Sequence, residues 1–484
     1  MLKVGIRNLR KMSFMSKVIQ VTQKFRPPAD AEFVPASLWN RRFRALVEES
    51  GRGQRLAIAV ERSDGSVSVY RTEIFPHQGD WTVANERYVE RLVKFLLWQR
   101  GGYKVTIGGD AKVAEHIRQV YSPAGRRAFD FHFMGERVYG LPFELHATSY
   151  EKAPEEKEST AELGRHLDGC RIGFDLGGSD RKCAAVIDGE VVHSEEVVWD
   201  PYWKSDPQYH FDEINDTLKR AAAHLPRVDA MGGSAAGVYV NNEVRVASLF
   251  RGVPQGLFNT RVRRLFYELQ AAWGGIPFVV VNDGEVTALA GSMALNDNGV
   301  LGVSMGTSQA GGYVTLHGAI TNWLNELAFV PVDYRDGAPV DEWSGDGGVG
   351  AQYFSQQAVG RLLPAVGIDL AKEMPLAEKL AETQKLMDGG DERAQRIFRS
   401  IGVYFGYAIA HYADFYDLRH VLVLGRVLSG AAGDTIVSAA REVLRGEFPE
   451  LAERIQLHLP SEKEKRHGQA VAAASLPQLP RKSG

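Results

Sequence analysis

The stretch RIGFDLGGSDRKCAAV, residues 171–186, is the part of the sequence that decides the fold. An apolar run ends at Asp175, two glycines and a short polar segment follow, and a second apolar run begins at Cys183. This pattern predicts a β-hairpin with a carboxylate at its mouth. Glycines at such a turn let backbone N–H groups approach an anion, and a neighbouring aspartate suits a magnesium ion on a polyphosphate. Taken alone, the stretch is explained equally well by an ordinary hairpin with a glycine turn.

Length and composition limit the class of protein. The chain has 484 residues, which is too long for one core and predicts two or three domains. A hydrophobic content of 44%, a charged content of 24% and a net charge of −3 are typical of a globular protein with no general attraction to nucleic acid or membranes. The only cysteines, Cys170 and Cys183, are too few for a disulfide framework or a cysteine-rich zinc site. No apolar run reaches the length of a membrane span, so we expect a cytoplasmic protein.

The first residues form a basic leader, which we assign to residues 1–28. No acidic residue occurs in the first 21 positions, and the segment lacks the apolar core and cleavage site of a signal peptide. A flexible leader, an extra upstream start and an organelle presequence all fit it, and we favour the first two.

Residues 29–150 read as a separate N-terminal α/β domain. A hairpin is predicted for Arg55–Glu61 and Val67–Phe75, followed by an amphipathic helix at Asn85–Arg100, a strand at Lys104–Ile107 and another helix. This order loosely resembles half of a ribonuclease-H-like fold, so a degenerate copy of that fold is an alternative. The role of the domain stays open. Residues 151–167 are charged and poor in apolar side chains, which predicts a linker.

The region after the linker carries polar side chains at the ends of predicted strands. Ser234 opens a small-residue loop after one strand. The fully apolar strand at Ile276–Val281 runs into Asn282 and Asp283, where a helix begins. An aspartate at such a strand end can accept a proton from a bound hydroxyl. A plain Asn-Asp helix cap explains the pair better if it is taken alone.

A second glycine-rich hairpin follows at Gly302–Tyr313. Its turn holds Gly306, Thr307 and Ser308, whose hydroxyls suit phosphate oxygens. Two such hairpins in one region suggest a nucleotide held between two similar lobes. Glu326 then precedes an apolar strand, and an alanine-rich helix is expected near the end of the chain.

These stretches together resemble the ROK family of sugar kinases and sugar-responsive repressors, within the superfamily of actin, hexokinase and heat-shock-chaperone ATPases. The similar region spans about residues 171–477. The matching segments are, in order, the first phosphate motif at Phe174–Ser179, the Asn-Asp pair at 282–283, the second phosphate loop at Gly306–Gly312, the adenosine-site strand at Val421–Gly425, and the closing helix at Gly468–Ala470.

The resemblance implies a fold of two ribonuclease-H-like, actin-like lobes with an interlobe cleft, preceded by the separate α/β domain. Lobe 1 would span 168–296 and lobe 2, with its closing helix, 297–477, leaving 478–484 as a tail. It implies an ATP-dependent sugar kinase that uses Mg²⁺; the alternative is a sugar-sensing or regulatory protein without turnover. It also implies a sugar as ligand and a homodimer.

The implied site residues fall into two groups. On the nucleotide side they are Asp175 (also holding magnesium through water), Gly177, Gly178, Ser179, Lys182, Gly306, Thr307, Ser308, Gly311 and Gly425. On the sugar side they are Ser234, Asn282, Glu326 and Asp283, the last being the catalytic base.

The chain departs from the ROK pattern in three places. Phe329 stands where the family has a histidine that binds sugar and zinc. The family's zinc-loop cysteines become Ser344, Asp346 and Ala351, so we predict no structural zinc. Arg426 replaces the second glycine of the adenosine strand, which bears on nucleotide binding. The N-terminal domain is longer than the family's winged helix and not notably basic, which argues against DNA binding.

Overall fold

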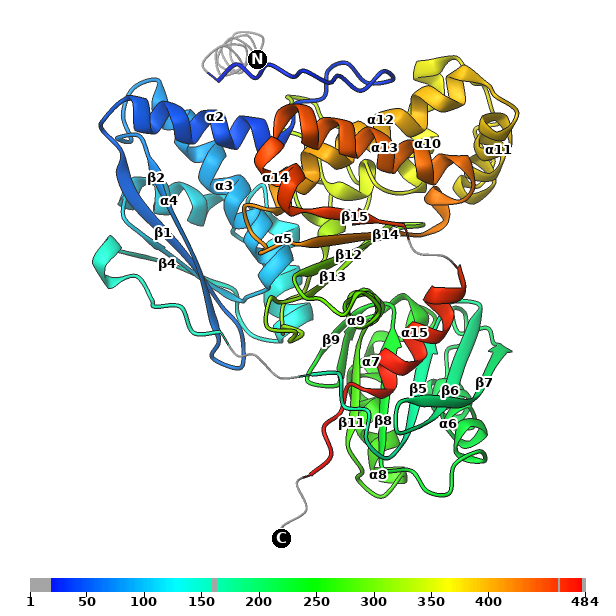
Figure 1. Cartoon of the computed structure of the whole chain (residues 1–484). Helices are drawn as coiled ribbons and strands as arrows, with labels where there is room; N and C mark the ends of the chain where they lie inside the picture. The colour runs from blue at the N-terminus through cyan, green and yellow to red at the C-terminus, as the bar shows by residue number, and fades with distance from the viewer. Residues whose placement is uncertain (1–18, 159–162, 460–461, 481–484) are drawn as a thin grey trace.

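The computed structural model describes residues 19–158, 163–459 and 462–480. Figure 1 shows two bodies: an upper one, in which the N-terminal unit lies beside lobe 2, and lobe 1 below it. The last helix, α15 (Glu462–Ala474), lies against lobe 1. Residues 1–18 of the predicted leader and 481–484 of the predicted tail lie outside the described residues.

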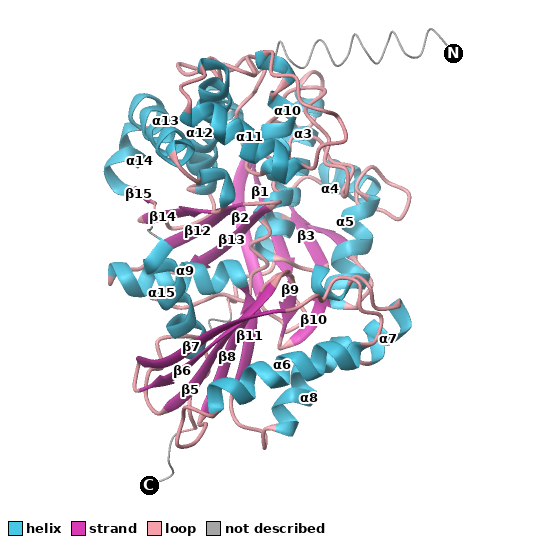
Figure 2. Ribbon diagram, turned by 90° about the vertical axis from the view of Figure 1, so that its right-hand side faces the viewer, coloured by secondary structure: helices cyan, strands magenta, loops and turns pink. Residues whose placement is uncertain are grey.

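Lobe 1 is a five-stranded sheet between helices (Figure 2). In sheet order its strands are β11 (Phe278–Asn282), β8 (Ala230–Ala235), β5 (Cys170–Leu176), β6 (Asp180–Ile187) and β7 (Glu190–Val198). The predicted hairpin is the antiparallel β5–β6 pair, while β8 and β11 run parallel to β5. The apolar residues of one face pack on α6 (Pro207–Ala222) and α8 (Leu265–Ala272). This is a ribonuclease-H-like arrangement, with an antiparallel meander extended by parallel strands.

The opposite face of this sheet lies directly against α15. A Cβ on Gly173 would come within 2.1 Å of the Ala470 carbonyl oxygen, and one on Gly232 within 1.8 Å of the Ala473 carbonyl oxygen. The alanine-rich helix expected at the end of the chain therefore packs backbone-close on the glycines of β5 and β8.

Lobe 2 repeats the arrangement with four strands. In sheet order they are β13 (Gln309–Val314), β12 (Val300–Met305), β14 (His420–Leu424) and β15 (Gln456–His458). The β12–β13 pair is antiparallel, whereas β12, β14 and β15 run parallel. One face packs on α9 (Asp283–Leu295) and the other on the largely buried α12 (Glu392–Tyr412) and α13 (Ala431–Glu447). The shorter helices of this lobe are α10 (Gln356–Leu362), α11 (Leu376–Asp388) and α14 (Pro449–Arg454).

The N-terminal unit has a four-stranded sheet of different topology. Its sheet order is β2 (Val67–Ile74), β1 (Gln54–Glu61), β3 (Lys104–Gly108) and β4 (Glu144–Thr148). Its helices are α2 (Ala36–Glu49), α3 (Trp81–Arg100), α4 (Ala111–Val120), α5 (Ala128–His132) and the π-helix η1 (Phe133–Tyr139). Here β3 runs antiparallel to β1, whereas in lobe 1 the corresponding strand, β8, runs parallel to β5. The alternative of a degenerate ribonuclease-H copy is therefore wrong.

The N-terminal unit has its own sheet but shares its hydrophobic core with lobe 2. Phe95 of α3 stacks on Phe415 with ring centroids 3.8 Å apart, and Phe33 packs on Tyr404 at 4.7 Å. Lobe 1 has a core of its own. Within the molecule, the separate N-terminal domain expected from the sequence is thus packed into one body with lobe 2.

Part of the predicted leader belongs to the same body. The Tyr407 hydroxyl donates to the Phe25 carbonyl oxygen at 3.1 Å, and the Lys24 N–H donates to Glu447 at 2.6 Å. Residues 19–28 therefore lie along α12 and α13. None of the helices among the described residues combines the length and the apolar character that crossing a membrane requires.

Candidate active site

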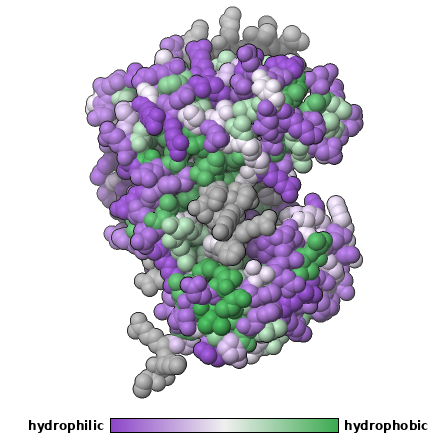
Figure 3. All heavy atoms as spheres, turned by 45° about the vertical axis from the view of Figure 1, so that its right-hand side comes forward, coloured by the Kyte–Doolittle hydropathy of each residue, from purple (hydrophilic) through white to green (hydrophobic). Residues whose placement is uncertain are grey.

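Three carboxylates converge at the cleft between the lobes. Asp175 lies near the carboxyl end of β5, Asp283 opens α9 directly after β11, and Glu326 precedes a short helix of lobe 2. The parallel strands β5, β8 and β11 end at the same edge of the sheet, which is where α/β folds place ligands. Figure 3 shows the surface hollowed between the upper body and lobe 1.

The carboxylates perturb one another's pKa values. Burial, and next the charge of Asp175, raises the pKa of Asp283 from 3.8 to about 6. Burial, and next the charge of Asp283, raises the pKa of Glu326 from 4.5 to about 7. A carboxylate with a pKa near 6 is ionised at neutral pH and still basic enough to accept a proton from a hydroxyl group. The three side chains thus form one electrostatic unit at the cleft.

Asp175 is held from the neighbouring strand and from its own hairpin. The Ser234 hydroxyl donates to Asp175 Oδ1 at 2.5 Å, and Lys182 Nζ lies 3.9 Å from Oδ2. Burial raises the pKa of Asp175, while Ser234 and Lys182 act in the opposite direction. A cavity of about 290 Å³ beside it is lined by Asp175, Lys182, Glu196 and Gln469, among others. Ser234, predicted as a sugar contact, has its hydroxyl on Asp175 in this structure.

Asn282 is the N-cap of α9. Its Oδ1 accepts the Gly284 N–H at 2.7 Å, and its Nδ2 donates to the Gly237 carbonyl at 2.7 Å. The helix-cap alternative therefore describes Asn282 correctly. One N–H and one lone pair of the amide remain for a ligand, and the cap fixes the direction of Asp283.

The turns of the two hairpins differ in how open they are. A Cβ on Gly178 would lie 1.9 Å from the Tyr202 hydroxyl oxygen, whereas one on Gly306 would meet nothing nearer than the Ser308 carbonyl oxygen at 3.8 Å. Thr307 and Ser308 are exposed. The second turn therefore offers free space and hydroxyls, while the first is closed on one side. Ser179, in the first turn, donates to Asp180 at 2.9 Å.

Other predicted phosphate-site glycines are explained by packing within the chain. A Cβ on Gly311 would lie 2.6 Å from the Asn325 carbonyl oxygen, and one on Gly425 2.3 Å from that of Met305. The adjacent Gly312 would meet the Gly284 carbonyl oxygen at 2.0 Å. These contacts bring the first turn of α9, and with it Asp283, against the second hairpin. A phosphate role for Gly311 and Gly425 stays a prediction.

Two ionisable side chains at the site, Glu285 and Asp180, are not among the site residues predicted from the sequence. Glu285 accepts the Asn325 side-chain amide at 2.5 Å and the Tyr313 N–H at 3.3 Å, and burial raises its pKa to about 8. An acid in the first helical turn resembles an ordinary helix-dipole partner, so nothing in the sequence distinguished it. Burial would raise the pKa of Asp180, but Lys182, Ser179 and, from the other lobe, Arg426 lower it. Arg426 therefore faces the first hairpin across the cleft.

No group of three or more histidine, cysteine, aspartate or glutamate side chains suited to a metal ion is found in the described ranges. At the positions that align with the family's zinc loop, Ser344 donates to Asp341 at 2.7 Å, and Asp346 lies among arginine and lysine side chains. These oxygen groups are already engaged within the protein. For Mg²⁺, Asp175 offers an oxygen ligand of the type that this ion prefers. One carboxylate is enough to hold it, because magnesium keeps several of its waters.

The two lobes and the cleft between them define an actin-like α/β protein. No family model and no curated protein sequence matches the chain. Among solved structures it is similar to the ROK hexokinase from Thermus thermophilus, with a TM-score of 0.50 and 20% identity over 63% of this chain and 97% of that one. It is also similar to a ROK family transcriptional regulator, a homologue of the E. coli MLC protein, with a TM-score of 0.51 and 18% identity over 64% of this chain and 79% of that one. The chain therefore has the fold of the ROK proteins, as the sequence predicted.

Proposed function

We propose that the chain is a divergent ROK protein that transfers the γ-phosphate of ATP to a hydroxyl of a sugar or sugar derivative, with Asp283 as the base. The observation that carries the proposal is the position of Asp283. It follows the parallel edge strand β11, is aimed by the Asn282 cap, lies beside Asp175 and Glu326, and has a pKa of about 6. A proton acceptor placed between a metal-side and an acceptor-side carboxylate suits phosphoryl transfer.

The proposed role of each residue follows from its position in the cleft. Asp175, with Lys182 beside it, would hold hydrated Mg²⁺, which supplies charge neutralisation to the phosphates when bound. Thr307 and Ser308 would donate hydroxyls to phosphate oxygens from the open second turn. Asp283 would accept the proton of the attacking hydroxyl. Closure of the lobes would exclude water, so that positioning and electrostatics supply most of the rate.

On the acceptor side, Asn282 and Glu326 would orient the sugar. With a pKa of about 7, Glu326 exists in both protonation states near neutral pH and can either donate or accept a hydrogen bond. The family's histidine is Phe329 here, so the acceptor would have no imidazole to contact at this position. This favours an acceptor other than glucose bound in the family's usual pose. The reaction would take place in the cytoplasm, and a homodimer is an expectation from the resemblance.

A sugar-sensing protein without turnover is the second candidate. Phe329 and Arg426 favour it, because both replace groups of the family's substrate sites, and one of the similar solved structures is a transcriptional regulator. The four features against it are Asp175, Asp283 and the two glycine-rich turns, which a protein without turnover has little need to keep together.

The test is ADP release from Mg-ATP with a panel of hexoses, amino sugars, sugar acids and polyols. The proposal predicts release that depends on one class of acceptor. Silence across the panel, accompanied by thermal stabilisation by a sugar, would overturn it in favour of a sensor.

A further inference from the structure

The end of α3, in the N-terminal unit, binds the backbone of the acceptor segment. The Glu326 N–H donates to the Trp98 carbonyl oxygen at 3.0 Å, and the Asn325 N–H donates to the Gln99 carbonyl oxygen at 2.9 Å. The last carbonyls of a helix have no partner within the helix, so α3 has acceptors to offer at this point. The N-terminal unit therefore fixes the main chain of Glu326.

A glycine-rich loop at 339–350 supports the same segment from lobe 2. The Gly350 N–H donates to the Val330 carbonyl oxygen at 3.1 Å, and the Val332 N–H to that of Gly348 at 2.8 Å. Residues 330–332, which follow Glu326 closely, are thus paired with this loop. Whatever holds the loop also holds the acceptor segment.

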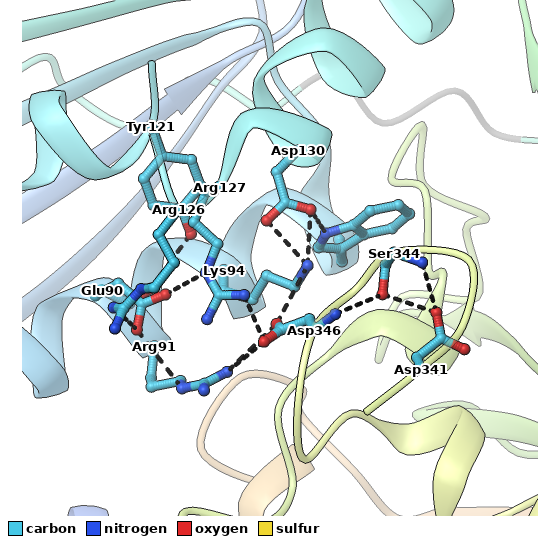
Figure 4. Close-up of polar contacts among 11 residues, drawn as sticks. Glu90, Arg91, Lys94, Tyr121, Arg126, Arg127, Asp130, Asp341, Ser344 and Asp346 are labelled. Carbon is cyan, nitrogen blue, oxygen red and sulfur yellow. Dashed lines mark hydrogen bonds and ion pairs between the residues drawn. The ribbon is translucent and has the colours of Figure 1, made fainter. Parts of the chain in front are cut away.

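The loop is anchored in the N-terminal unit by Asp346, which is 4% exposed. As Figure 4 shows, its carboxylate lies among three cations: it contacts Arg127, and lies 3.3 Å from Arg91 Nη1 and 3.5 Å from Lys94 Nζ. Burial alone would raise the pKa of Asp346, but Arg91, Lys94 and Arg127 hold it well below its usual value. Asp346 therefore enters the N-terminal unit as an ionised and almost completely buried side chain.

Two further buried carboxylates complete this Asp346 cluster. Lys94 Nζ lies 2.7 Å from Asp130 Oδ1, and Arg127 Nε donates to Glu90 Oε1 at 2.5 Å. Three buried carboxylates, Glu90, Asp130 and Asp346, thus face Arg91 and Lys94 of α3 and Arg127 of the turn before α5. Arg126, at the surface, is a fourth cation and lies 3.3 Å from Glu90. Since Asp346 contacts Arg91, Lys94 and Arg127, its removal takes a carboxylate partner from each of these largely buried cations.

The cluster is continuous with aromatic packing around the acceptor segment. Trp98 Nε1 donates to Asp130 at 2.9 Å, and the Trp98 ring packs on Phe329 with centroids 4.4 Å apart. Phe329 in turn packs on Trp343 of the loop at 5.0 Å. The same helix thus touches the segment through its carbonyls, an indole and the ion cluster.

We propose that the N-terminal unit is the scaffold of the acceptor half of the site, and that Asp346 is a positioning residue that acts on Glu326 through the 339–350 loop and α3. The inference rests on the proposed function for the meaning of Glu326 and on the contacts alone for the positioning. In the alignment with the ROK pattern, Asp346 takes the place of a zinc-binding cysteine, so an ion cluster holds the loop at this position. Positioning of the acceptor segment would also be the role of the N-terminal unit, which the sequence left open.

The experiment compares Asp346→Asn with Asp336→Asn in the full chain by hydrogen exchange. Asp336 is the matched control, because it also pairs with an arginine of α3, Arg87, at 2.9 Å, but at the surface. We expect Asp346→Asn to speed exchange of the 323–350 amides by roughly tenfold or more, with β5 and β8 unchanged. The control should change either region by less than about twofold.

Equal exchange of 323–350 in both variants, or acceleration spread equally over lobe 1, would overturn the inference. If Asp346→Asn does not fold, Arg91→Met is the milder variant, since Arg91 is the partly exposed cation of the cluster. Arg91→Met should speed exchange of the same amides, 323–350, by a smaller factor. Unchanged exchange in this variant would equally overturn the inference.

A kinetic readout separates this inference from the proposed function. With an acceptor in hand, Asp346→Asn should raise the acceptor KM by roughly tenfold and leave the ATP KM within about twofold, since Asp346 contacts cations of the N-terminal unit and its loop pairs with residues 330–332 of the acceptor segment. If Asp346→Asn shows the expected exchange pattern but the wild-type chain never turns over, the kinase is refuted and the positioning role stands.

Discussion

The Ser234 hydroxyl donates to Asp175 Oδ1 at 2.5 Å and so joins the ends of the neighbouring strands β8 and β5. Ser234 was predicted to touch the sugar, yet in the folded chain its hydroxyl serves the carboxylate expected to bind magnesium. Asp175 receives this bond in a half-buried position, where an unpaired carboxylate is costly.

We therefore expect Ser234→Ala to act on the metal side of the reaction. Loss of one hydrogen bond to a charged group corresponds to about 1.5–3 kcal/mol, so the Mg²⁺ concentration needed for half-maximal turnover should rise by roughly tenfold or more. Titration of Mg²⁺ at saturating acceptor measures this shift. An unchanged Mg²⁺ response with a raised acceptor KM would instead indicate that Ser234 contacts the sugar.

The pKa of Asp283 predicts opposite effects of pH on activity and on stability. As a base it must be ionised, so kcat/KM should fall as pH drops below about 6. The folded state, however, favours the protonated form, because the pKa is raised from 3.8. Its contribution to stability is complete below the unfolded pKa and is lost as pH rises through about 6.

It follows that Asp283→Asn should stabilise the fold at neutral pH, by up to about 3 kcal/mol if the whole rise is removed. Thermal or denaturant unfolding of both chains at several pH values measures this difference. A variant that is less stable than the wild type at neutral pH would show that Asp283 is not strained in the way its burial implies.

The close approach of α15 to lobe 1 predicts a cost for Gly232→Ala. The new Cβ would lie 1.8 Å from the Ala473 carbonyl oxygen, so the helix has to move. Overpacking of this kind costs about 1–3 kcal/mol. Gly256→Ala is the control, because nothing lies within 4 Å of its Cβ. Chemical denaturation should show a lowered free energy of unfolding only for Gly232→Ala. Equal stability of the two variants would show that α15 is not packed as described.

The open turn at Thr307 and Ser308 predicts an effect confined to the nucleotide. Both side chains are exposed, so Thr307→Val and Ser308→Ala should leave unfolding unchanged. Each should raise the ATP KM by roughly fivefold to a hundredfold if its hydroxyl donates to a phosphate. Steady-state kinetics with ATP varied at saturating acceptor tests this. Wild-type ATP kinetics in both variants would remove the second turn from the phosphate site.

Local patterns in the sequence were sufficient for much of lobe 1 and lobe 2. The glycine turn after Asp175 predicted the β5–β6 hairpin, and the apolar run before Asn282 predicted a strand with a polar end, although β11 is an edge strand that is only partly buried. Both are short-range signals, in which a turn or a strand is encoded within about ten residues. The convergence of Asp175 and Asp283 follows from parallel strands that end at one edge of a sheet.

The contribution of the N-terminal unit could not be predicted in this way. Glu90 and Lys94 belong to a helix whose buried face was predicted from its apolar residues, yet both charges are buried. Lys94 pairs with Asp130 and Asp346, and Glu90 pairs with Arg127. These partners lie far away in the sequence, and no local pattern predicts such a pairing. The bond from Glu326 to Trp98 is likewise between main-chain groups, on which the side-chain sequence is silent.

The most direct test of the kinase assignment is acceptor-dependent ADP release by the wild type and by Asp283→Asn, each with a direct measurement of sugar binding. We predict that the variant loses roughly a hundredfold to ten-thousandfold in turnover, as expected for removal of a general base, while sugar binding is kept. Turnover in Asp283→Asn equal to that of the wild type would contradict the assignment of the base and the mechanism built on it.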